Sequence, residues 1–553
     1  MSDNDEQTSG DTLSTPRANA SDRPTDASRR TGASRRTFLK GTGALAAVGA
    51  FGSFGAQAHG EYPNRVVGYY PSWASDYGPE DVPFDQLTHF NFAFLEPESD
   101  GTVVLSDPDD DDLLQELADY DDEETVFQLA ISGGWYPQEF SDAAATEENR
   151  KRFARTAVDH VETYGFDGLD IDWEFPDGTT RESDPENFTL LLEEIRNELD
   201  DRFGSWTHLT IAASPNANIA DDAYEVETIS DYLDHVNVMT YDYHGDWSSE
   251  TNFNAPFDSP PEDPNGREDF NASHSMNHWA DKPISNDKLV MGLPFYGRSY
   301  SGVADTNEGL FNSFDSSTSA TYADISQNIE PQSDYEYHWH HDAKVPWVYS
   351  AADETFVAYD DEASISNKCR FVTDNGFGGV MCWELSQDST NTLIARMHDE
   401  MHGDYSNTKF RLQDHTVTTG DHWVRDGPGT SSEHIDTAPE GTTGTVLDGP
   451  VESDGYAWYR ISYDDGISDG WSAANALEAA AFDADHPAVT NADLWVRDGP
   501  GTSNEHIDTA PEGTGGTVLD GPVESDGYTW WRVDYDDGVS TGWSAGEYLD
   551  QSY

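Results

Sequence analysis

The segment from residue 62 to residue 402 alternates short apolar runs with longer amphipathic stretches. Eight of the runs have the length and composition of buried strands. They are residues 65–70, 89–95, 126–132, 166–174, 208–214, 235–241, 288–296 and 378–384. Between them, residues 147–164 and 186–203 repeat apolar side chains every three or four positions, as helices do, and Gly165 ends the first. This alternation predicts an α/β fold, a (β/α)8 TIM barrel, whose active site lies at the C-terminal ends of its strands.

The fourth apolar run carries an unusual set of acids. Asp170, Asp172 and Glu174 fall on one face of the predicted strand, because successive side chains alternate between the two faces. Like charges held close together repel, which raises the pKa of at least one of them toward the range that a general acid needs. Two other interpretations of this run stay open: a solvated acidic turn, and a divalent-metal site built from carboxylates.

The same run resembles the signature of glycoside hydrolase family 18, the chitinases and their relatives, which reads Asp-x-x-Asp-x-Asp-x-Glu. The pattern is complete here from Asp167 to Glu174. Other family landmarks follow the ends of predicted strands: Ser132-Gly133-Gly134, Met239-Thr240-Tyr241-Asp242, Gly292-Leu293-Pro294-Phe295-Tyr296-Gly297-Arg298 and Trp383-Glu384. The resemblance covers about residues 62–402 and implies neither a metal nor a cofactor.

The resemblance implies a role for each catalytic residue. Glu174 acts as general acid and then as general base. The nucleophile is the carbonyl oxygen of the substrate's own 2-acetamido group, so family 18 departs from the usual two-carboxylate scheme. Asp172 accepts a hydrogen bond from the acetamido N–H, and Asp170 shares a proton with Asp172. Tyr241 donates a hydrogen bond to the acetamido carbonyl, and Asp242 supports the distorted sugar. Asp167 has the opposite parity on the strand and is expected to be structural.

Further residues are candidates for binding the sugar chain. Trp383 would form the apolar floor beneath the reacting sugar, because flat aromatic rings pack well against the C–H faces of sugars. The candidates for neighbouring subsites are Tyr69, Trp73, Gly134, Trp135, Met239, Tyr296 and Arg298. Each has barrel core as its alternative, and for Tyr69 and Met239 that alternative stays fully open.

The interval between the seventh and eighth predicted strands is too long for one helix. Residues 335–341, 346–350 and 355–359 are strand-like and aromatic. They resemble the α+β insertion that many family members carry here, at about residues 297–377, which deepens the cleft. The histidines at positions 338, 340 and 341 raise the question of a metal site. Surface strands are the favoured interpretation, since no carboxylate–histidine ligand spacing is completed.

The function implied is that of a secreted chitinase, which hydrolyses β-1,4-linked N-acetylglucosamine in chitin with retention through the substrate-assisted mechanism. Two alternatives remain. One is an endo-β-N-acetylglucosaminidase acting on glycoproteins. The other is a chitin-binding lectin, which keeps the barrel and loses the catalytic acid; the presence of Glu174, Asp172 and Tyr241 speaks against it.

The C-terminal part of the chain contains a repeat. Residues 423–478 and 495–550 align without gaps, and 44 of the 56 aligned positions are identical. Short strands and frequent glycine turns predict two small all-β barrels. The opening Trp-Val-Arg-Asp-Gly-Pro-Gly resembles bacterial SH3-like domains, which implies a polymer or a cell surface as a partner. Trp471 and Trp543 are expected in the core, whereas Trp423 and Trp495 are left open.

The net charge is extreme. The chain has 107 acidic residues against 29 Lys and Arg, a formal net charge of −78. Such a charge excludes nucleic acid as a partner and disfavours anionic membranes. Its self-repulsion would be screened in molar salt, where the Debye length is about 3 Å, so the composition is typical of halophilic adaptation. A disordered acidic protein is excluded because aromatic residues make up 12% of the chain.

The N-terminus resembles a signal for Tat export. A twin arginine, Arg35-Arg36, precedes an uncharged stretch rich in Gly and Ala, which closes with an Ala-x-Ala cleavage pattern at Ala58. A transmembrane anchor is the rival interpretation, which the low apolarity disfavours. An extracellular protein with no membrane contact after cleavage is therefore expected. The two cysteines, Cys369 and Cys382, are predicted to be buried thiols.

The predicted organisation is a signal peptide, a catalytic barrel and two small modules joined by linkers. The bounds are residues 1–58 for the signal, 59–402 for the barrel, 403–420 for the linker, 421–480 for the first SH3-like domain and 493–553 for the second.

Overall fold

The computed structural model describes most of the chain beyond residue 63. The described residues are 64–121, 125–133, 137–260, 263–265, 267, 269–340, 342–403, 409–410, 412, 414–463, 466–479, 487–490, 492, 494–511, 514–526, 528–535 and 538–551. The predicted signal, part of the predicted linker, and the candidate site residues Gly134 and Trp135 lie outside them. Within the described residues, no helix combines the length and apolarity that a membrane span requires.

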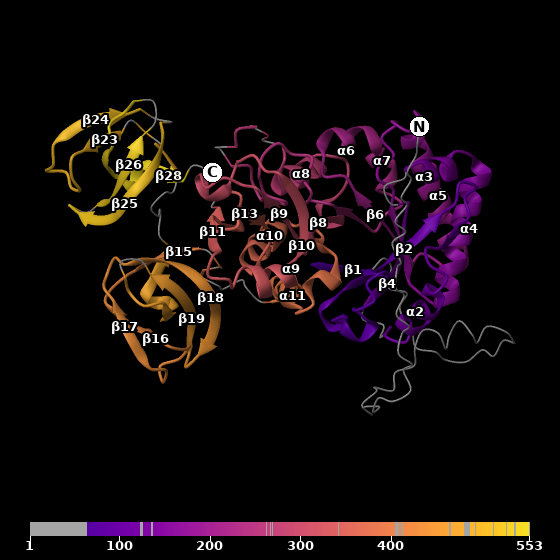
Figure 1. The fold of residues 1–553 in the computed structure, drawn as a ribbon, viewed down its shortest axis with the longest axis horizontal. Helices are drawn as coiled ribbons and strands as arrows, with labels where there is room; N and C mark the ends of the chain where they lie inside the picture. The colour runs from indigo at the N-terminus through magenta and orange to yellow at the C-terminus, as the bar shows by residue number, and fades with distance from the viewer. Residues whose placement is uncertain are drawn as a thin grey trace, which may run out of the picture. The chain divides into compact units, whose positions relative to one another are not determined.

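Eight parallel strands close into a barrel, so the predicted (β/α)8 fold is confirmed (Figure 1). The order around the barrel is β1-β14-β8-β7-β6-β5-β4-β2, and β2 pairs with β1 to close it. The strands are β1 (Arg65–Pro71), β2 (His89–Pro97), β4 (Val126–Ser132), β5 (Gly168–Asp172), β6 (His208–Ala213), β7 (His235–Val238), β8 (Leu289–Pro294) and β14 (Gly379–Trp383). A short strand, β3 (Val103–Leu105), pairs antiparallel with the end of β2.

Helices follow the barrel strands and cover their outer side (Figure 1). They are α2 (Asp110–Leu117), α3 (Pro137–Ala144), α4 (Glu147–Tyr164), α5 (Asp184–Phe203), α6 (Ala217–Ala223), α7 (Val226–Ile229), α8 (Ala272–Ala280), α10 (Glu362–Asp374) and α11 (Thr392–His402). Helix α4 has the predicted bounds: Thr146 caps its first turn by accepting a hydrogen bond from the Asn149 N–H, and Gly165 ends it with a φ of 74°.

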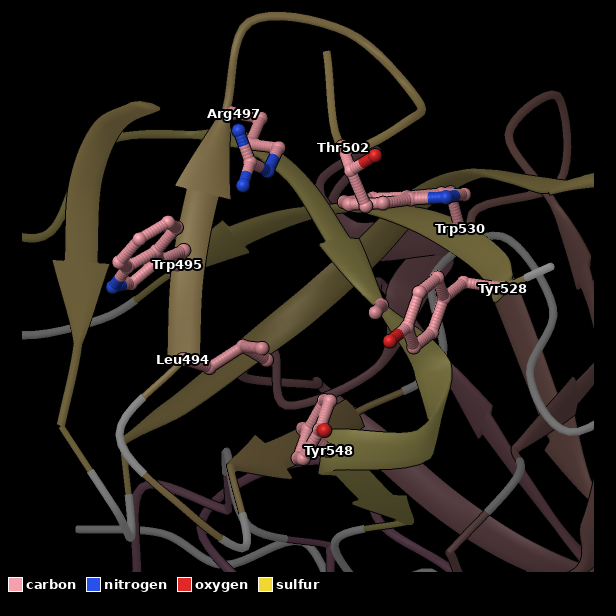
Figure 2. A pocket seen from close by; sticks show the side chains of 8 residues that line it. Leu494, Trp495, Arg497, Thr502, Tyr528, Trp530 and Tyr548 are labelled. Carbon is pink, nitrogen blue, oxygen red and sulfur yellow. The ribbon is translucent and has the colours of Figure 1, made fainter. Parts of the chain in front are cut away.

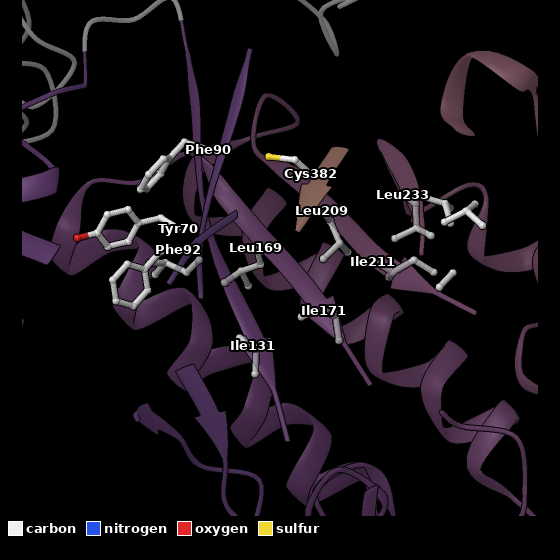
Figure 3. Packing of buried hydrophobic residues seen from close by; sticks show 14 of the residues in the cluster. Tyr70, Phe90, Phe92, Ile131, Leu169, Ile171, Leu209, Ile211, Leu233 and Cys382 are labelled. Carbon is white, nitrogen blue, oxygen red and sulfur yellow. The ribbon is translucent and has the colours of Figure 1, made fainter. Parts of the chain in front are cut away.

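The main core lies between the barrel and its helices. Leu169 and Ile171 of β5 are fully buried there and pack with Leu209 and Ile211 of the neighbouring β6 (Figure 3). Burying a side chain of this size stabilises the fold by about 1.5–3 kcal/mol. Because side chains alternate along a strand, this outward packing forces Asp170 and Asp172 into the barrel interior.

The predicted insertion between the seventh and eighth barrel strands is also confirmed. It forms a five-stranded antiparallel sheet in the order β10-β9-β13-β12-β11. Its strands are β9 (Tyr296–Ser301), β10 (Ser316–Thr321), β11 (Glu336–His340), β12 (Val345–Ser350) and β13 (Thr355–Ala358). The sheet has a small core of its own around Tyr300, Trp347 and Phe356. His338 stacks on Trp347, with ring centroids 4.9 Å apart.

The two C-terminal modules have the same all-β topology, as the repeat predicts. The first is a seven-stranded sheet in the order β17-β16-β20-β19-β18-β15-β21, and the second has the equivalent order β24-β23-β27-β26-β25-β22-β28. The first module consists of β15 (His415–Thr418), β16 (His422–Arg425), β17 (His434–Ala438), β18 (Thr443–Ser453), β19 (Tyr456–Tyr463), β20 (Gly470–Ala473) and β21 (Leu477–Ala479). The second consists of β22 (Pro487–Thr490), β23 (Leu494–Arg497), β24 (His506–Ala510), β25 (Gly515–Ser525), β26 (Tyr528–Tyr535), β27 (Gly542–Ala545) and β28 (Leu549–Gln551).

Individual side chains settle three smaller predictions. Cys369 and Cys382 are buried thiols and no disulfide joins them, as expected. Trp471 and Trp543 are half-buried rather than fully in the core. Asp167 is buried and accepts a hydrogen bond from the Phe127 N–H at 3.0 Å, which is the structural role expected for it.

Candidate active site

An apolar cluster lines the barrel interior, separate from the core between strands and helices. Its buried members are Val67, Tyr69, Ala93, Ala130, Tyr241, Ala255, Val290, Tyr296 and Met381. Phe94, Met239 and Trp383 pack against it and are only partly buried. Tyr69, Tyr241 and Tyr296, three of the aromatic residues proposed from the sequence, belong to this cluster, and the proposed Trp383 packs against it. The interior of the barrel is therefore the candidate active site.

Asp170 is the innermost acid and is completely buried. One of its carboxylate oxygens accepts a hydrogen bond from the Tyr69 hydroxyl at 2.5 Å. The other accepts hydrogen bonds from the Thr210 hydroxyl and from Asn237 Nδ2. Burial raises the pKa of Asp170, while hydrogen bonds, first among them the one from Asp172, oppose the rise. Four donors around one buried carboxyl favour its ionised form relative to that of its neighbour.

Asp172 follows one pleat later on β5 and holds the proton of the pair. Burial, and then the charge of Asp170, raise the pKa of Asp172 well above its usual range. Asp170 already accepts hydrogen bonds from Tyr69, Thr210 and Asn237, which favour its ionised form, so the shared proton belongs to Asp172. Its Oδ1 atom is buried and has no hydrogen-bond partner among the described residues. Such an acceptor is costly to bury unless a ligand completes it.

Glu174 lies just beyond the end of β5 and is half-buried. Burial raises the pKa of Glu174 to about 7, and the negative charge of Asp242 adds to the rise. A carboxyl with this pKa keeps its proton over much of the neutral range and can donate it to a leaving group. The sequence predicts that Asp170, Asp172 and Glu174 share one face of the strand. In the structure, the first two form a proton-sharing pair and Glu174 is a single outer acid.

Asp242 is held by two other residues that the sequence proposes for the site, Tyr296 and Arg298. It has a left-handed backbone, with φ of 60°. The Tyr296 hydroxyl donates to its Oδ1 at 2.7 Å, and Arg298 forms an ion pair with the same oxygen. Tyr241 is buried with its hydroxyl 4.0 Å from Met381 Sδ. Burial raises the pKa of Tyr241 well above its usual range, and the charges of Glu174 and Asp172 contribute. Tyr241 is therefore a neutral hydrogen-bond donor close to both acids.

Aromatic rings border the acids on one side. Trp383 stacks on Phe94, with ring centroids 5.5 Å apart and planes at 19°. Trp73 lies 6.1 Å from the Trp383 ring and is 58% exposed, which supports its assignment to an accessible subsite. Tyr69 contacts Trp383 edge-on but is buried, with its hydroxyl on Asp170. Tyr69 therefore orients the acid pair from below, and the sugar-binding roles of the other rings stay predictions.

Four residues of the site are absent from the sequence prediction. Thr210 and Asn237 donate to Asp170, Phe94 stacks on Trp383, and Trp247 is 56% exposed beside the Arg298 guanidinium at 5.2 Å. A usable signal exists for two of them: Thr210 and Asn237 are polar residues inside otherwise apolar strands. Neither Phe94 nor Trp247 carries such a signal, because each depends on how separate strand ends meet.

Comparison with known proteins finds two family models that match parts of this chain. Residues 65–388 match the model of glycosyl hydrolases family 18, and residues 424–478 match that of the bacterial SH3 domain. Chitinase A1 of Niallia circulans is 32% identical over 408 residues, which cover 61% of this chain and 58% of that one. The Group IV chitinase of Ostrinia furnacalis superposes with a TM-score of 0.57 at 27% identity, over 61% of this chain and 99% of that one. A family 18 N-acetylglucosaminidase of Paenibacillus barengoltzii gives 0.55 at 29% identity, over 61% and 99%.

The chain belongs to glycoside hydrolase family 18, because the family model matches more than half of its length. It spans little more than half of chitinase A1. Asp170, Asp172 and Glu174 lie at the C-terminal end of a barrel strand, where enzymes with this fold carry their active sites.

Proposed function

We propose that this protein is a chitinase that hydrolyses the β-1,4 linkages of N-acetylglucosamine polymers. The observation that carries the proposal is the arrangement at the end of β5. A single outer acid, Glu174, has its pKa raised to about 7, and behind it a buried pair, Asp170 and Asp172, shares one proton. This arrangement supplies one proton donor and one polar anchor beside it.

The chemistry follows from substrate assistance. Glu174 donates its proton to the glycosidic oxygen as the bond from that oxygen to C1 breaks. The acetamido carbonyl oxygen of the same sugar bonds to C1 and gives an oxazolinium ion. Glu174, now a carboxylate, takes a proton from water as the water oxygen bonds to C1, which reopens the ring with net retention.

Asp172 and Tyr241 hold the acetamido group during this sequence. The unpartnered Oδ1 of Asp172 can accept the acetamido N–H, and the Tyr241 hydroxyl can donate to the carbonyl oxygen that attacks C1. The positive charge that develops on the ring lies beside the ionised member of the Asp170–Asp172 pair. Electrostatic stabilisation of this kind acts strongly where water is excluded.

A second function is favoured by one comparison. A protein of similar fold and 29% identity is described as a family 18 N-acetylglucosaminidase, so removal of single terminal sugars is the main alternative to cleavage within chains. An endo-β-N-acetylglucosaminidase acting on glycoproteins, and a lectin without turnover, are the remaining candidates.

The test compares four substrates in about 2 M KCl, where the charge of the chain is screened. They are colloidal chitin, chitin oligosaccharides, a high-mannose glycopeptide and fully deacetylated chitosan. We expect hydrolysis of the first two and none of the last, since chitosan lacks the attacking acetamido group. Efficient cleavage of chitosan would rule out the mechanism, and cleavage of the glycopeptide alone would rule out the substrate.

The proposal also includes the N-terminal export signal and the two C-terminal modules. Residues 1–58 would direct export through the Tat pathway and be removed, which leaves the barrel of residues 59–402 and the modules of residues 421–480 and 493–553 outside the cell. The twin arginine and the Ala-x-Ala pattern support this. Mass spectrometry of the protein recovered from culture medium tests it: a mature N-terminus at His59 is expected, and a retained signal would refute it.

A further inference from the structure

Each C-terminal module contains a pocket that the catalytic reaction does not use. In the second module the pocket has a volume of about 310 Å³, and in the first about 270 Å³. In the second module its walls include Trp495, Arg497, Thr502, Tyr528, Trp530 and Ala545 (Figure 2). The residues 72 positions earlier line the first pocket and are of the same six types. The same site is therefore built twice.

The aromatic walls of the pocket are fixed, and one of them is exposed. Trp495 is 57% exposed, and its ring stacks on His506 with centroids 4.9 Å apart. Trp423 has the same exposed fraction in the first module. Trp530 is buried, and its indole N–H donates to the Ser525 carbonyl at 3.0 Å. Large apolar rings held open in this way are typical of binding surfaces.

One arginine lies between the two tryptophans of each pocket. The guanidinium of Arg497 is 5.3 Å from the Trp495 ring and 5.9 Å from the Trp530 ring. Its Nη1 donates to the Asn504 carbonyl at 2.6 Å, which fixes its direction. Arg425 has the same two ring distances in the first module. Within the described residues, neither guanidinium is paired with a carboxylate.

The charge of the pockets is opposite to that of the chain. No Asp or Glu belongs to the described lining of either pocket, although the chain has 107 acidic residues. With only 29 Lys and Arg available, an arginine without an acidic partner in an acid-free pocket complements an anion. Arginine matches a carboxylate especially well, because its planar fork can donate two parallel hydrogen bonds.

We propose that each pocket binds one sugar unit of a carboxylated polysaccharide, a polyuronate. The sugar ring stacks on the exposed tryptophan, and its carboxylate pairs with the arginine. Two identical sites on one chain suit a ligand that repeats, since binding at one site raises the effective concentration at the other. An acidic peptide offers the same charge but lacks a regular series of flat rings for Trp423 and Trp495.

The charge of the whole chain gives this site an unusual dependence on salt. A polyanion approaching a protein of net charge −78 is repelled at low ionic strength. In molar salt the Debye length falls to about 3 Å, so long-range repulsion is screened while direct contacts in the pocket survive in part. Binding should therefore strengthen as salt rises, whereas ordinary binding between a protein and a polyanion weakens.

The experiment titrates the full-length chain with oligogalacturonate by calorimetry, at about 0.5 and about 2 M KCl. Two sites are expected, with tighter binding at the higher salt. The double variants Arg425→Gln/Arg497→Gln and Trp423→Ala/Trp495→Ala should each lose about 10- to 100-fold in affinity. Trp206→Ala is the matched control, because Trp206 is 37% exposed on the barrel domain, and it should bind as the parent does.

Parallel titrations with polyglutamate and sedimentation with colloidal chitin separate the other ligands. Three results would each overturn the proposal. They are equal affinity for polyglutamate, absence of any binding, and adsorption to chitin that depends on Trp423 and Trp495 without binding of oligogalacturonate. The circular dichroism spectrum and the thermal unfolding curve of each double variant should equal those of the parent, which shows that the variants are folded. The result is thus independent of the proposed catalytic function.

Discussion

Asp242 increases the proton affinity of Glu174 through its negative charge. Its negative charge raises the pKa of Glu174, after burial, to about 7. Activity requires the protonated acid, so the rate should fall as pH rises through this value. Asp242→Asn removes the repulsion and also frees the positive charge of Arg298, and both changes lower the pKa of Glu174. The alkaline limb of the kcat/KM profile should therefore move to lower pH.

The control for this shift is Asp231→Asn, which neutralises an exposed acid beyond α7. It should leave the profile in place. An unchanged alkaline limb in Asp242→Asn would show that another group controls it. Glu174→Gln should abolish the limb together with turnover, while oligosaccharide binding persists.

Thr210 acts through Asp170 and is a positioning residue. Its hydroxyl donates to a fully buried carboxylate, and hydrogen bonds to charged groups are worth about 1.5–3 kcal/mol. Thr210→Val keeps the shape and removes the donor, which raises the pKa of Asp170 and shifts the shared proton from Asp172 toward Asp170. We expect kcat to fall about 10- to 100-fold, with a much smaller change in KM. Thr163→Val on the exposed side of α4 is the control and should match the parent.

The acids of the site could be predicted from the sequence because their spacing along one strand fixes their common face. The donors around them could not be assigned, since Thr210, Asn237 and Tyr69 reach Asp170 from three other strands. Which strands are neighbours, and in which register, is a property of the closed barrel. For the same reason Tyr69 stayed open between substrate binding and core, and the structure gives it a third role.

At the scale of the elements, the starts of three strands bring buried histidines together. His89 begins β2, His208 begins β6 and His235 begins β7, and the His89 ring centroid lies 5.5 Å from that of His208 and 5.0 Å from that of His235. Burial lowers the pKa of His89 and His235 well below 6.5. The positive charges of nearby histidines and Arg65 add to the effect. The rings of His89 and His235 are therefore neutral in the folded protein.

A loss of stability in acid follows. As pH falls below about 6.5, the unfolded chain binds protons at these histidines and the folded chain does not. The free energy of unfolding should therefore decrease from this pH downward. His235→Gln should reduce the slope measured by denaturant titration between pH 6.5 and 5. His274→Gln on the surface of α8 is the control, and a parental slope in His235→Gln would contradict the explanation.

Element boundaries show where sequence patterns suffice. Helix α4 is bounded by a threonine cap and a glycine, both visible in the sequence, and its predicted range is correct. Helix α5 begins at Asp184, two residues before the predicted start, because Pro185 is tolerated in a first helical turn where its missing N–H costs nothing. Apolar periodicity alone does not predict those two additional residues.

At the scale of the whole molecule, the formal charge of −78 acts on every domain at once. Compact folding brings these charges closer together, so their repulsion opposes the folded state. Salt bridges do little to offset it, because water and salt screen the charges of exposed pairs such as Lys151–Glu147. Screening by the solvent is the remaining means of relief. Stability should therefore depend on ionic strength far more than in a protein of balanced charge.

Thermal unfolding tests this dependence. The melting temperature should rise steeply between about 0.1 and about 2 M KCl, as the Debye length shrinks from about 10 Å toward 3 Å or less. Replacing KCl with sucrose at equal osmotic strength is the control, because an excluded neutral solute favours burial without screening charge. If sucrose raised the melting temperature as much as KCl does, burial rather than repulsion would limit stability. A melting temperature that is flat in both solutes would show that the acidic surface costs the folded state nothing.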